Sequence, residues 1–236
     1  MEMTMLEKYK MMASLMEGDY ESVRNGLFIK AVNADRNAEI LKKAPHTRIG
    51  DIALTYWVEI SQGRDYVESA IIRVDKFPKL GLEQLHRDAL ANSVRLFPPV
   101  LMPMWDMYMK VKDSMKEFPE ESLEFIDGIS MEEMEEFWRG ESRSFILTNQ
   151  AGLNGASCLW YPGMMEEIYQ KIGGEYFILP SSAHELILLP KDERRAGTLY
   201  EMIQTVNIQA VAPEEILSWE LWAYDSQEKT VKTVDM

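Results

Sequence analysis

Short runs of β-branched and aromatic residues alternate with helical patterns through the last third of the chain. Strands are predicted at 144–148, 156–161, 176–179 and 185–189, helices at 162–172 and 198–209, and a closing hairpin at 221–224 and 230–234. The Asn154-Gly155 pair favours the positive φ angles of a two-residue hairpin turn between the first two of these strands. Antiparallel hairpins interleaved with helices predict an α+β fold.

The first half of the chain shows the same mixture. A strand at 51–60 and a second at 68–75 flank a turn cluster at 62–65, and a helix follows over 82–96. A short helix is expected over 33–44, capped by Asn33 or Asp35, and another helix over 100–112. The predicted fold is therefore two halves that each contain a β-β-α unit, together with an N-terminal helix.

An acidic segment divides these halves and predicts the domain organisation. Residues 1–112 hold the N-terminal helix and the first half, 113–140 form a short acidic helical connector, and 141–236 form the second half; the two halves either stand apart or share one compact unit. The stretches 70–76 and 92–98 align with 185–191 and 207–213 at a constant offset of 115 residues. This pattern indicates an internal pseudo-repeat, with chance similarity as the alternative explanation.

Apolar side chains recur at helical spacing in the first 16 residues. They are Met5, Leu6, Tyr9, Met12 and Met16, and Gly18 ends the pattern. The simplest interpretation is that this side of the helix packs on the core. The alternative is an adaptable docking surface, since flexible thioether side chains repack easily against different partners.

Charge and targeting signals exclude several classes of protein. The chain of 236 residues carries a formal net charge of −14, which repels the phosphate backbone, so no nucleic-acid binding is expected. No basic and apolar leader and no apolar run of bilayer length occurs, so we expect a cytoplasmic protein without a membrane segment. The single cysteine, Cys158, excludes a disulfide scaffold and is interpreted as a buried packing residue.

The stretch Leu179-Pro-Ser-Ser-Ala-His-Glu185 contains the most reactive combination of side chains. Ser182, His184 and Glu185 offer a hydroxyl, an imidazole and a carboxylate, the residue types of a hydrolase, and they are the candidate catalytic residues. The simpler interpretation is a tight connection between two strands, in which serine hydroxyls accept hydrogen bonds from turn amides. No nucleophile-elbow motif supports the hydrolase interpretation.

Signals for cofactors and ligands are weaker. The three histidines are isolated from one another and no phosphate-binding glycine motif occurs, so no metal and no cofactor are predicted. Ser181, Asn92 and Asn207 are candidate ligand-binding residues. For the two asparagines we favour a helix C-cap, where Asn tolerates the left-handed conformation.

Several motifs, taken together, resemble one family. They include Leu147-Thr-Asn149, Asn154-Gly-Ala156, Tyr161-Pro-Gly163, Leu179-Pro-Ser-Ser-x-His-Glu185 and Val206-Asn207-x5-Pro213-Glu-Glu-Ile-Leu217. In these motifs the chain resembles the bacterial domain-of-unknown-function family 5688 over roughly residues 20–225. The resemblance implies a bacterial intracellular α+β protein, one that begins late relative to other members. It supplies no activity, but it makes Ser181, Ser182, His184 and Glu185 the best candidates for a site.

These observations favour a non-enzymatic binding or regulatory module whose partner is a protein or a small molecule. The alternative is a small hydrolase or ligand-processing enzyme that uses Ser182, His184 and Glu185. A third hypothesis makes the acidic surface a decoy for a nucleic-acid-binding protein.

Overall fold

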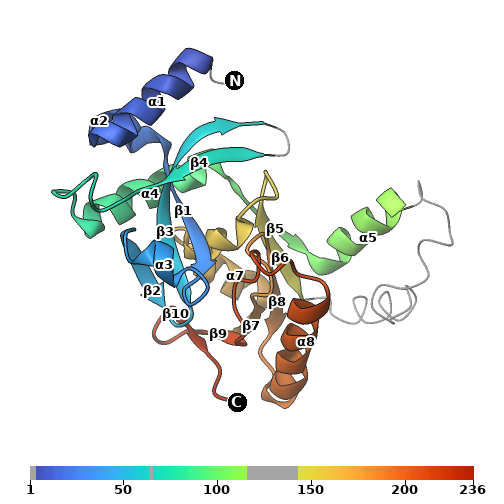
Figure 1. The fold of residues 1–236 in the computed structure, drawn as a ribbon. Helices are drawn as coiled ribbons and strands as arrows, with labels where there is room; N and C mark the ends of the chain where they lie inside the picture. Colours follow the sequence, from blue (N-terminus) through green and yellow to red (C-terminus); the bar gives the residue numbers. More distant parts are fainter. Residues whose placement is uncertain (1–3, 64–65, 116–142) are drawn as a thin grey trace.

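A computed structural model describes residues 4–63, 66–115 and 143–236 as two antiparallel sheets surrounded by helices, which confirms the predicted α+β class (Figure 1). The helices are α1 (Met5–Glu17), α2 (Tyr20–Val23), α3 (Ala38–Leu41), α4 (Leu82–Leu96), α5 (Met104–Met115), α7 (Met164–Ile172) and α8 (Ala196–Gln209). The 3-10 helices of these described residues are η1 (Arg24–Gly26), η3 (Gly155–Trp160) and η4 (Glu193–Arg195). In the described ranges, no helix combines the length and apolar composition that crossing a bilayer requires.

The first sheet is built around one long strand. Its strands are β1 (Leu27–Asn33), β2 (His46–Ile49), β3 (Ile52–Gln62) and β4 (Val67–Ile71). β1 pairs along one edge of β3, while β2 and β4 pair with successive parts of the other edge. The β3–β4 pairing confirms the hairpin expected in the first half of the sequence.

The outer edge of β1 is satisfied by side chains from other elements. Ile29 N–H donates to Ser93 Oγ at 3.0 Å, and Ala31 N–H donates to Ser157 Oγ at 2.9 Å. Asn33 Nδ2 donates to the Leu217 carbonyl at 3.1 Å. Edge strands expose unpaired backbone groups, and here serine hydroxyls of α4 and η3 satisfy two of them, while the Asn33 side chain ties the end of β1 to the chain before β9. These bonds also tie the first sheet to the second half.

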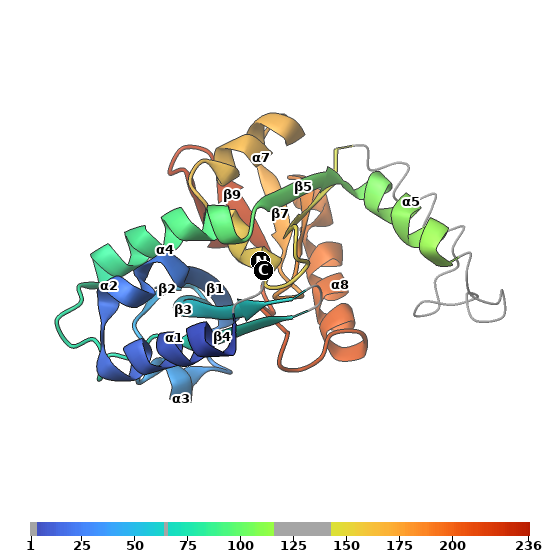
Figure 2. The same cartoon turned by 90° about the horizontal axis from the view of Figure 1, so that it is seen from above.

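The second sheet has six strands in the order β10-β9-β7-β8-β6-β5. They are β5 (Pro99–Pro103), β6 (Phe145–Asn149), β7 (Tyr176–Leu179), β8 (Leu186–Pro190), β9 (Trp222–Asp225) and β10 (Thr230–Thr233). β5 follows α4 directly and pairs with β6, so the first half of the sequence supplies one edge of this sheet (Figure 2). The division into halves at residues 113–140 stays a prediction.

One hydrophobic core joins the two sheets. Leu54 and Tyr56 of β3 belong to the same buried cluster as Ile178 of β7 and Trp222 of β9. Gly50 has a φ of +57°, and a Cβ atom there would lie 3.0 Å from the Trp222 ring. Glycine therefore permits both the backbone conformation and the close packing of the indole, which is 2% exposed.

Three sequence predictions of local structure are wrong. The expected helix at 33–44 is reduced to α3, because Asn33 still belongs to β1 and its side chain accepts the Arg36 N–H in a turn. The expected strand at 156–161 is η3, although Asn154 does have a positive φ of 55°. The expected helix at 100–112 begins with strand β5.

Several other predicted elements are confirmed, one strand was not predicted, and one predicted segment lies mostly outside the described residues. Helices α4, α7 and α8 and the closing hairpin β9–β10 are confirmed, with Gly173 ending α7 in the left-handed conformation. The strand β1 fell in a stretch that the sequence left unassigned. Most of the predicted acidic connector lies outside the described residues.

Helix α1 contacts the body through a different side than expected. A capping box of Thr4 and Glu7 begins it and Gly18 ends it. Leu15 is buried and Met11 packs against the core, whereas Met5, Leu6, Tyr9, Met12 and Met16 are all exposed. The prediction that these five residues face the core is wrong. We call these five residues the α1 face.

Candidate functional site

The stretch 179–185 forms the connection between β7 and β8, and a second segment is paired to it. Leu217 N–H donates to the Ser181 carbonyl at 3.2 Å, and Ser218 N–H donates to the Pro180 carbonyl at 3.0 Å. In the other direction, Ala183 N–H donates to the Glu215 carbonyl at 2.8 Å. The chain before β9 thus runs antiparallel to the connection from Pro180 to Ala183.

His184 links three segments through its imidazole ring. Its Nδ1 accepts the Asn154 N–H at 3.2 Å, and its Nε2 lies 3.2 Å from Glu215 Oε1. A neutral ring that accepts at Nδ1 carries its hydrogen on Nε2, which then donates to the carboxylate. The imidazole therefore holds the loop after β6, the β7–β8 connection and the segment before β9 together. We call Asn154, Ser182, His184 and Glu215 the His184 cluster.

Ser182 and Glu185 do not complete a catalytic triad with this ring. Ser182 Oγ accepts the backbone N–H of His184 at 2.9 Å, which is a local turn bond. The carboxylate beside the imidazole belongs to Glu215, not to Glu185, which immediately precedes β8. A nucleophilic serine would need its hydroxyl hydrogen-bonded to an imidazole nitrogen, and both nitrogens of His184 already face other groups.

The loop after β6 packs tightly against this cluster. Thr148 Oγ1 donates to the His184 carbonyl at 2.9 Å, and the Asn149 side chain bonds the backbone of Ala151 and Leu153. A Cβ atom on Gly155 would lie 2.4 Å from both the His184 carbonyl oxygen and Thr148 Oγ1. Glycine is the residue that allows this approach.

Four of the stretches that carry the family resemblance converge here. Stretches 147–149, 154–156, 179–185 and 213–217 are far apart in the sequence but are joined by the hydrogen bonds just described. Glu215 is the functional candidate that sequence reasoning missed. Its presence within the motif that ends at Leu217 was the available signal.

Neither candidate asparagine is a helix C-cap. Asn92 lies inside α4 and its Nδ2 donates to the Arg24 carbonyl at 2.8 Å. Asn207 lies inside α8, is buried, and donates from Nδ2 to the Ser218 carbonyl at 2.9 Å. The C-cap prediction is therefore wrong, because both residues lie inside their helices and their side chains donate to backbone carbonyls of other segments. Asn207 therefore lies next to the segment that pairs with Ser181, whereas Asn92 binds η1, which leads into the first sheet.

A second polar network joins the two sheets next to this region. Ser218 Oγ donates to the Asp51 carboxylate at 2.8 Å and accepts the Trp222 indole N–H at 3.1 Å. Burial raises the pKa of the Asp51 carboxyl above its usual value. The network fixes the β2–β3 turn to the chain before β9, which is a structural role.

Lys30 occupies an unusual environment on β1. Its Nζ lies 4.1 Å from the centre of the Trp57 ring and donates to Ser69 Oγ at 2.9 Å. Burial lowers the pKa of this amine from 10.5 to about 8.

The part of the chain that the structure describes contains no metal-binding arrangement and no exposed thiol. No three His, Cys, Asp or Glu side chains converge there in a metal-binding arrangement. Cys158 is fully buried in η3, and burial raises the pKa of its thiol to about 12.

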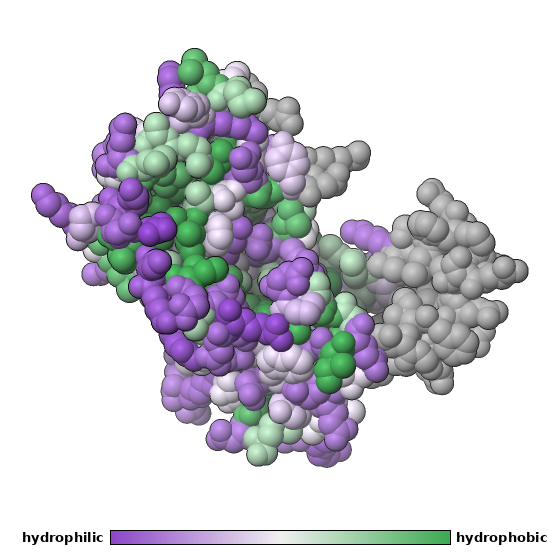
Figure 3. All heavy atoms as spheres, viewed as in Figure 1, coloured by the Kyte–Doolittle hydropathy of each residue, from purple (hydrophilic) through white to green (hydrophobic). Residues whose placement is uncertain are grey.

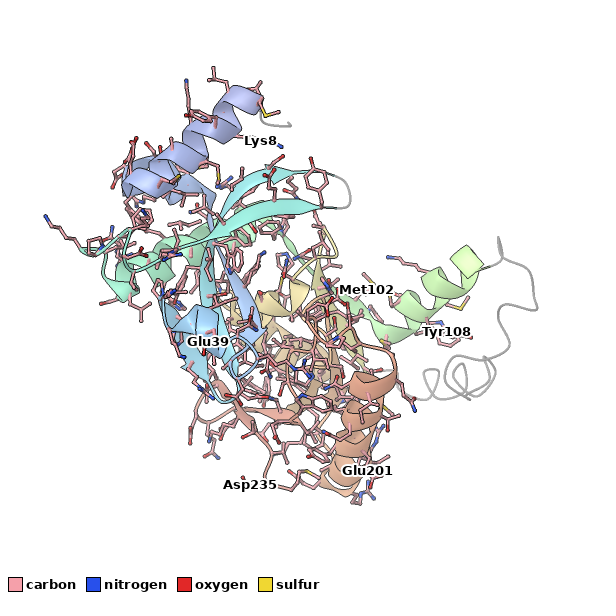
Figure 4. All side chains as sticks on the ribbon, viewed as in Figure 1. Lys8, Glu39, Met102, Tyr108, Glu201 and Asp235 are labelled. Atoms are coloured by element: carbon pink, nitrogen blue, oxygen red, sulfur yellow. The ribbon has the colours of Figure 1, made fainter. Side chains whose placement is uncertain are left out.

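Among the residues that the structure describes, no other element exposes as many large apolar side chains as the α1 face. Its exposed fractions are 84% for Met5, 61% for Leu6, 73% for Tyr9, 43% for Met12 and 67% for Met16. At the top of the molecule, where α1 lies, apolar side chains are exposed among polar ones (Figure 3). Lys8 instead points to the β3–β4 hairpin, where its Nζ lies 3.2 Å from Glu68 Oε2 (Figure 4).

The comparisons with known proteins yield one match. The model of a family of unknown function, DUF5688, matches residues 3–226. No curated protein and no solved structure matches the chain significantly. Since the match spans nearly the whole sequence, the chain belongs to this family of unknown function.

Proposed function

We infer that this protein is a non-enzymatic binding module that contacts other protein surfaces through the α1 face. The observation that supports this function is that α1 carries apolar side chains beyond those that it packs on the body. Met11 and Leu15 pack on the body, while the α1 face meets solvent. A surface helix normally turns one apolar stripe to the core and polar residues to solvent, so a further exposed apolar stripe is suited to a partner.

The His184 cluster supports the same function indirectly. Its imidazole holds three loops together, and its serine hydroxyl accepts a backbone N–H. This arrangement stabilises a rigid framework and leaves no activated nucleophile in the cluster. The hydrolase alternative gains no support from the geometry.

A site-specific crosslink tests the proposed binding surface. We would place a photo-crosslinking amino acid at Tyr9 and, as a matched control, at Ile208, which is 75% exposed on α8. α8 lies at the opposite end of the molecule from α1 (Figure 1). A protein crosslinked at position 9 and not at position 208 is the expected result, and mass spectrometry would identify it.

Catalysis is tested separately with His184→Ala, with circular dichroism to verify folding. Turnover of an ester, amide or phosphoester substrate that this variant loses while it stays folded would overturn the non-enzymatic function. Absence of any crosslink at position 9 in cells would overturn the binding surface.

A further inference from the structure

We propose that the partner of the α1 face is a second copy of this chain, packed helix against helix in antiparallel orientation. This inference rests on the proposed function and names the occupant of the same surface. Spacing, area and charge each support it.

The spacing suits packing against another helix. Met5, Tyr9, Met12 and Met16 follow one another at intervals of four, three and four residues, which places them in one stripe along the helix. This is the interval pattern by which two helices interlock their side chains. Leu6 lies beside the stripe and widens it.

The area suits two copies. Taking about 200 Å² for a fully exposed residue of this size, the exposed fractions leave roughly 600 Å² on each copy. An isologous dimer uses the same patch twice, so the total is roughly 1,200 Å², at the lower end of stable interfaces. A single helix face is therefore sufficient for a dimer with a dissociation constant on the order of micromolar.

The charge distribution also favours a second copy at this position. The whole chain carries −14, but α1 has two acidic residues, Glu7 and Glu17, and two basic residues, Lys8 and Lys10. The helix is thus neutral, and two copies can approach through it without local repulsion.

Orientation follows from the helix dipoles. Antiparallel packing sets the positive N-terminal end of each helix beside the negative C-terminal end of the other, whereas parallel packing sets like ends together. In the antiparallel arrangement, Tyr9 packs against Met12 of the partner subunit, and Met5 packs against Met16 of the partner subunit. The body supports the helix from behind through Leu15 and the Lys8–Glu68 ion pair.

Sedimentation velocity tests the dimer directly, with the full chain from about 1 to 100 µM. We expect a concentration-dependent dimer, weakened at least ~50-fold by Met12→Glu, because the change buries an unpaired charge in the interface. Ile208→Glu, a change of the same kind at an exposed apolar residue on α8, should leave the dissociation constant unchanged. Position 12 is 43% exposed, so the variant keeps its fold, which circular dichroism verifies.

Cysteine crosslinking tests the orientation. The native Cys158 is buried, so an introduced cysteine is the accessible thiol. Mixed Tyr9→Cys and Met12→Cys chains should form the mixed disulfide faster than either chain forms its own. Faster self-pairing of each variant would overturn the antiparallel arrangement.

A wild-type chain that stays monomeric at 100 µM overturns the second-copy inference. The crosslink at position 9 then tests the proposed function separately. A crosslink to a different protein would support the proposed binding function with another partner. The absence of any crosslink would overturn both the proposed function and the second-copy inference.

Discussion

Replacing Lys30 with methionine should stabilise the protein at neutral pH. The Lys30 amine lies over the Trp57 ring and has a pKa lowered by burial from 10.5 to about 8. A shift of about 2.5 units corresponds to roughly 3 kcal/mol of unfavourable burial of the charge. Partial exposure reduces this figure, and the cation–π contact and the hydrogen bond to Ser69 offset about 1–2 kcal/mol of it.

The expected net gain for Lys30→Met is therefore about 1–2 kcal/mol in the free energy of unfolding at pH 7. Methionine has a similar length and keeps a favourable sulfur contact with the indole. The exposed Lys79 provides the matched control, because Lys79→Met removes the same charge from a solvated position.

The gain should disappear at high pH. Between pH 8 and 10.5 the folded chain has lost the Lys30 proton while the unfolded chain retains it, so wild-type stability rises with pH in this window. Urea titrations followed by circular dichroism at pH 7 and pH 10 measure the difference between variant and wild type. A difference that is the same at both pH values, or destabilisation by Lys30→Met at pH 7, would refute the reasoning.

Three further predictions concern the framework. Gly155→Ala should lower the free energy of unfolding by about 2–4 kcal/mol, because its methyl group would overlap the His184 carbonyl. The control is Gly197→Ala in α8, where the methyl group has free space and the change should be neutral or stabilising. Equal melting temperatures for the two variants would contradict this prediction. Ser218→Ala should lower the free energy of unfolding by about 1–3 kcal/mol in urea titrations, since the Asp51 carboxylate and the Trp222 N–H each lose a partner. A decrease below about 0.5 kcal/mol would contradict the structural role of the Ser218 hydroxyl. Cys158 should not react with a thiol reagent until urea unfolds the chain, so rapid labelling of the native protein would be inconsistent with its burial.

Continuous β-rich runs bounded by turn residues were predictable, and β3, β7 and β9 are the examples. β5 was not, because Pro99 and Pro103 indicate a break in a strand. Its position at the edge of the sheet explains why proline is tolerated there. β1 was also missed, since Lys30 and Asn33 interrupt its apolar pattern, and their partners come from β4 and from the chain before β9.

The candidate site shows the same limit. The sequence indicated His184 and its neighbours, but the ring nitrogens bond to Asn154 and Glu215, each about 30 residues away in the chain. Such pairs depend on how the second sheet is assembled. Local sequence reasoning therefore identified the imidazole but paired it with Glu185, whereas the carboxylate beside the ring is that of Glu215.

Pairing of β5 with β6 has a consequence for how this chain can vary in length. Met104 N–H donates to the Ser144 carbonyl at 3.0 Å, so the chain leaves the sheet and re-enters it at a single point. The cost of closing a loop between fixed ends grows only slowly with its length. A change in the length of chain between Met104 and Ser144 therefore need not disturb the register of β5 and β6.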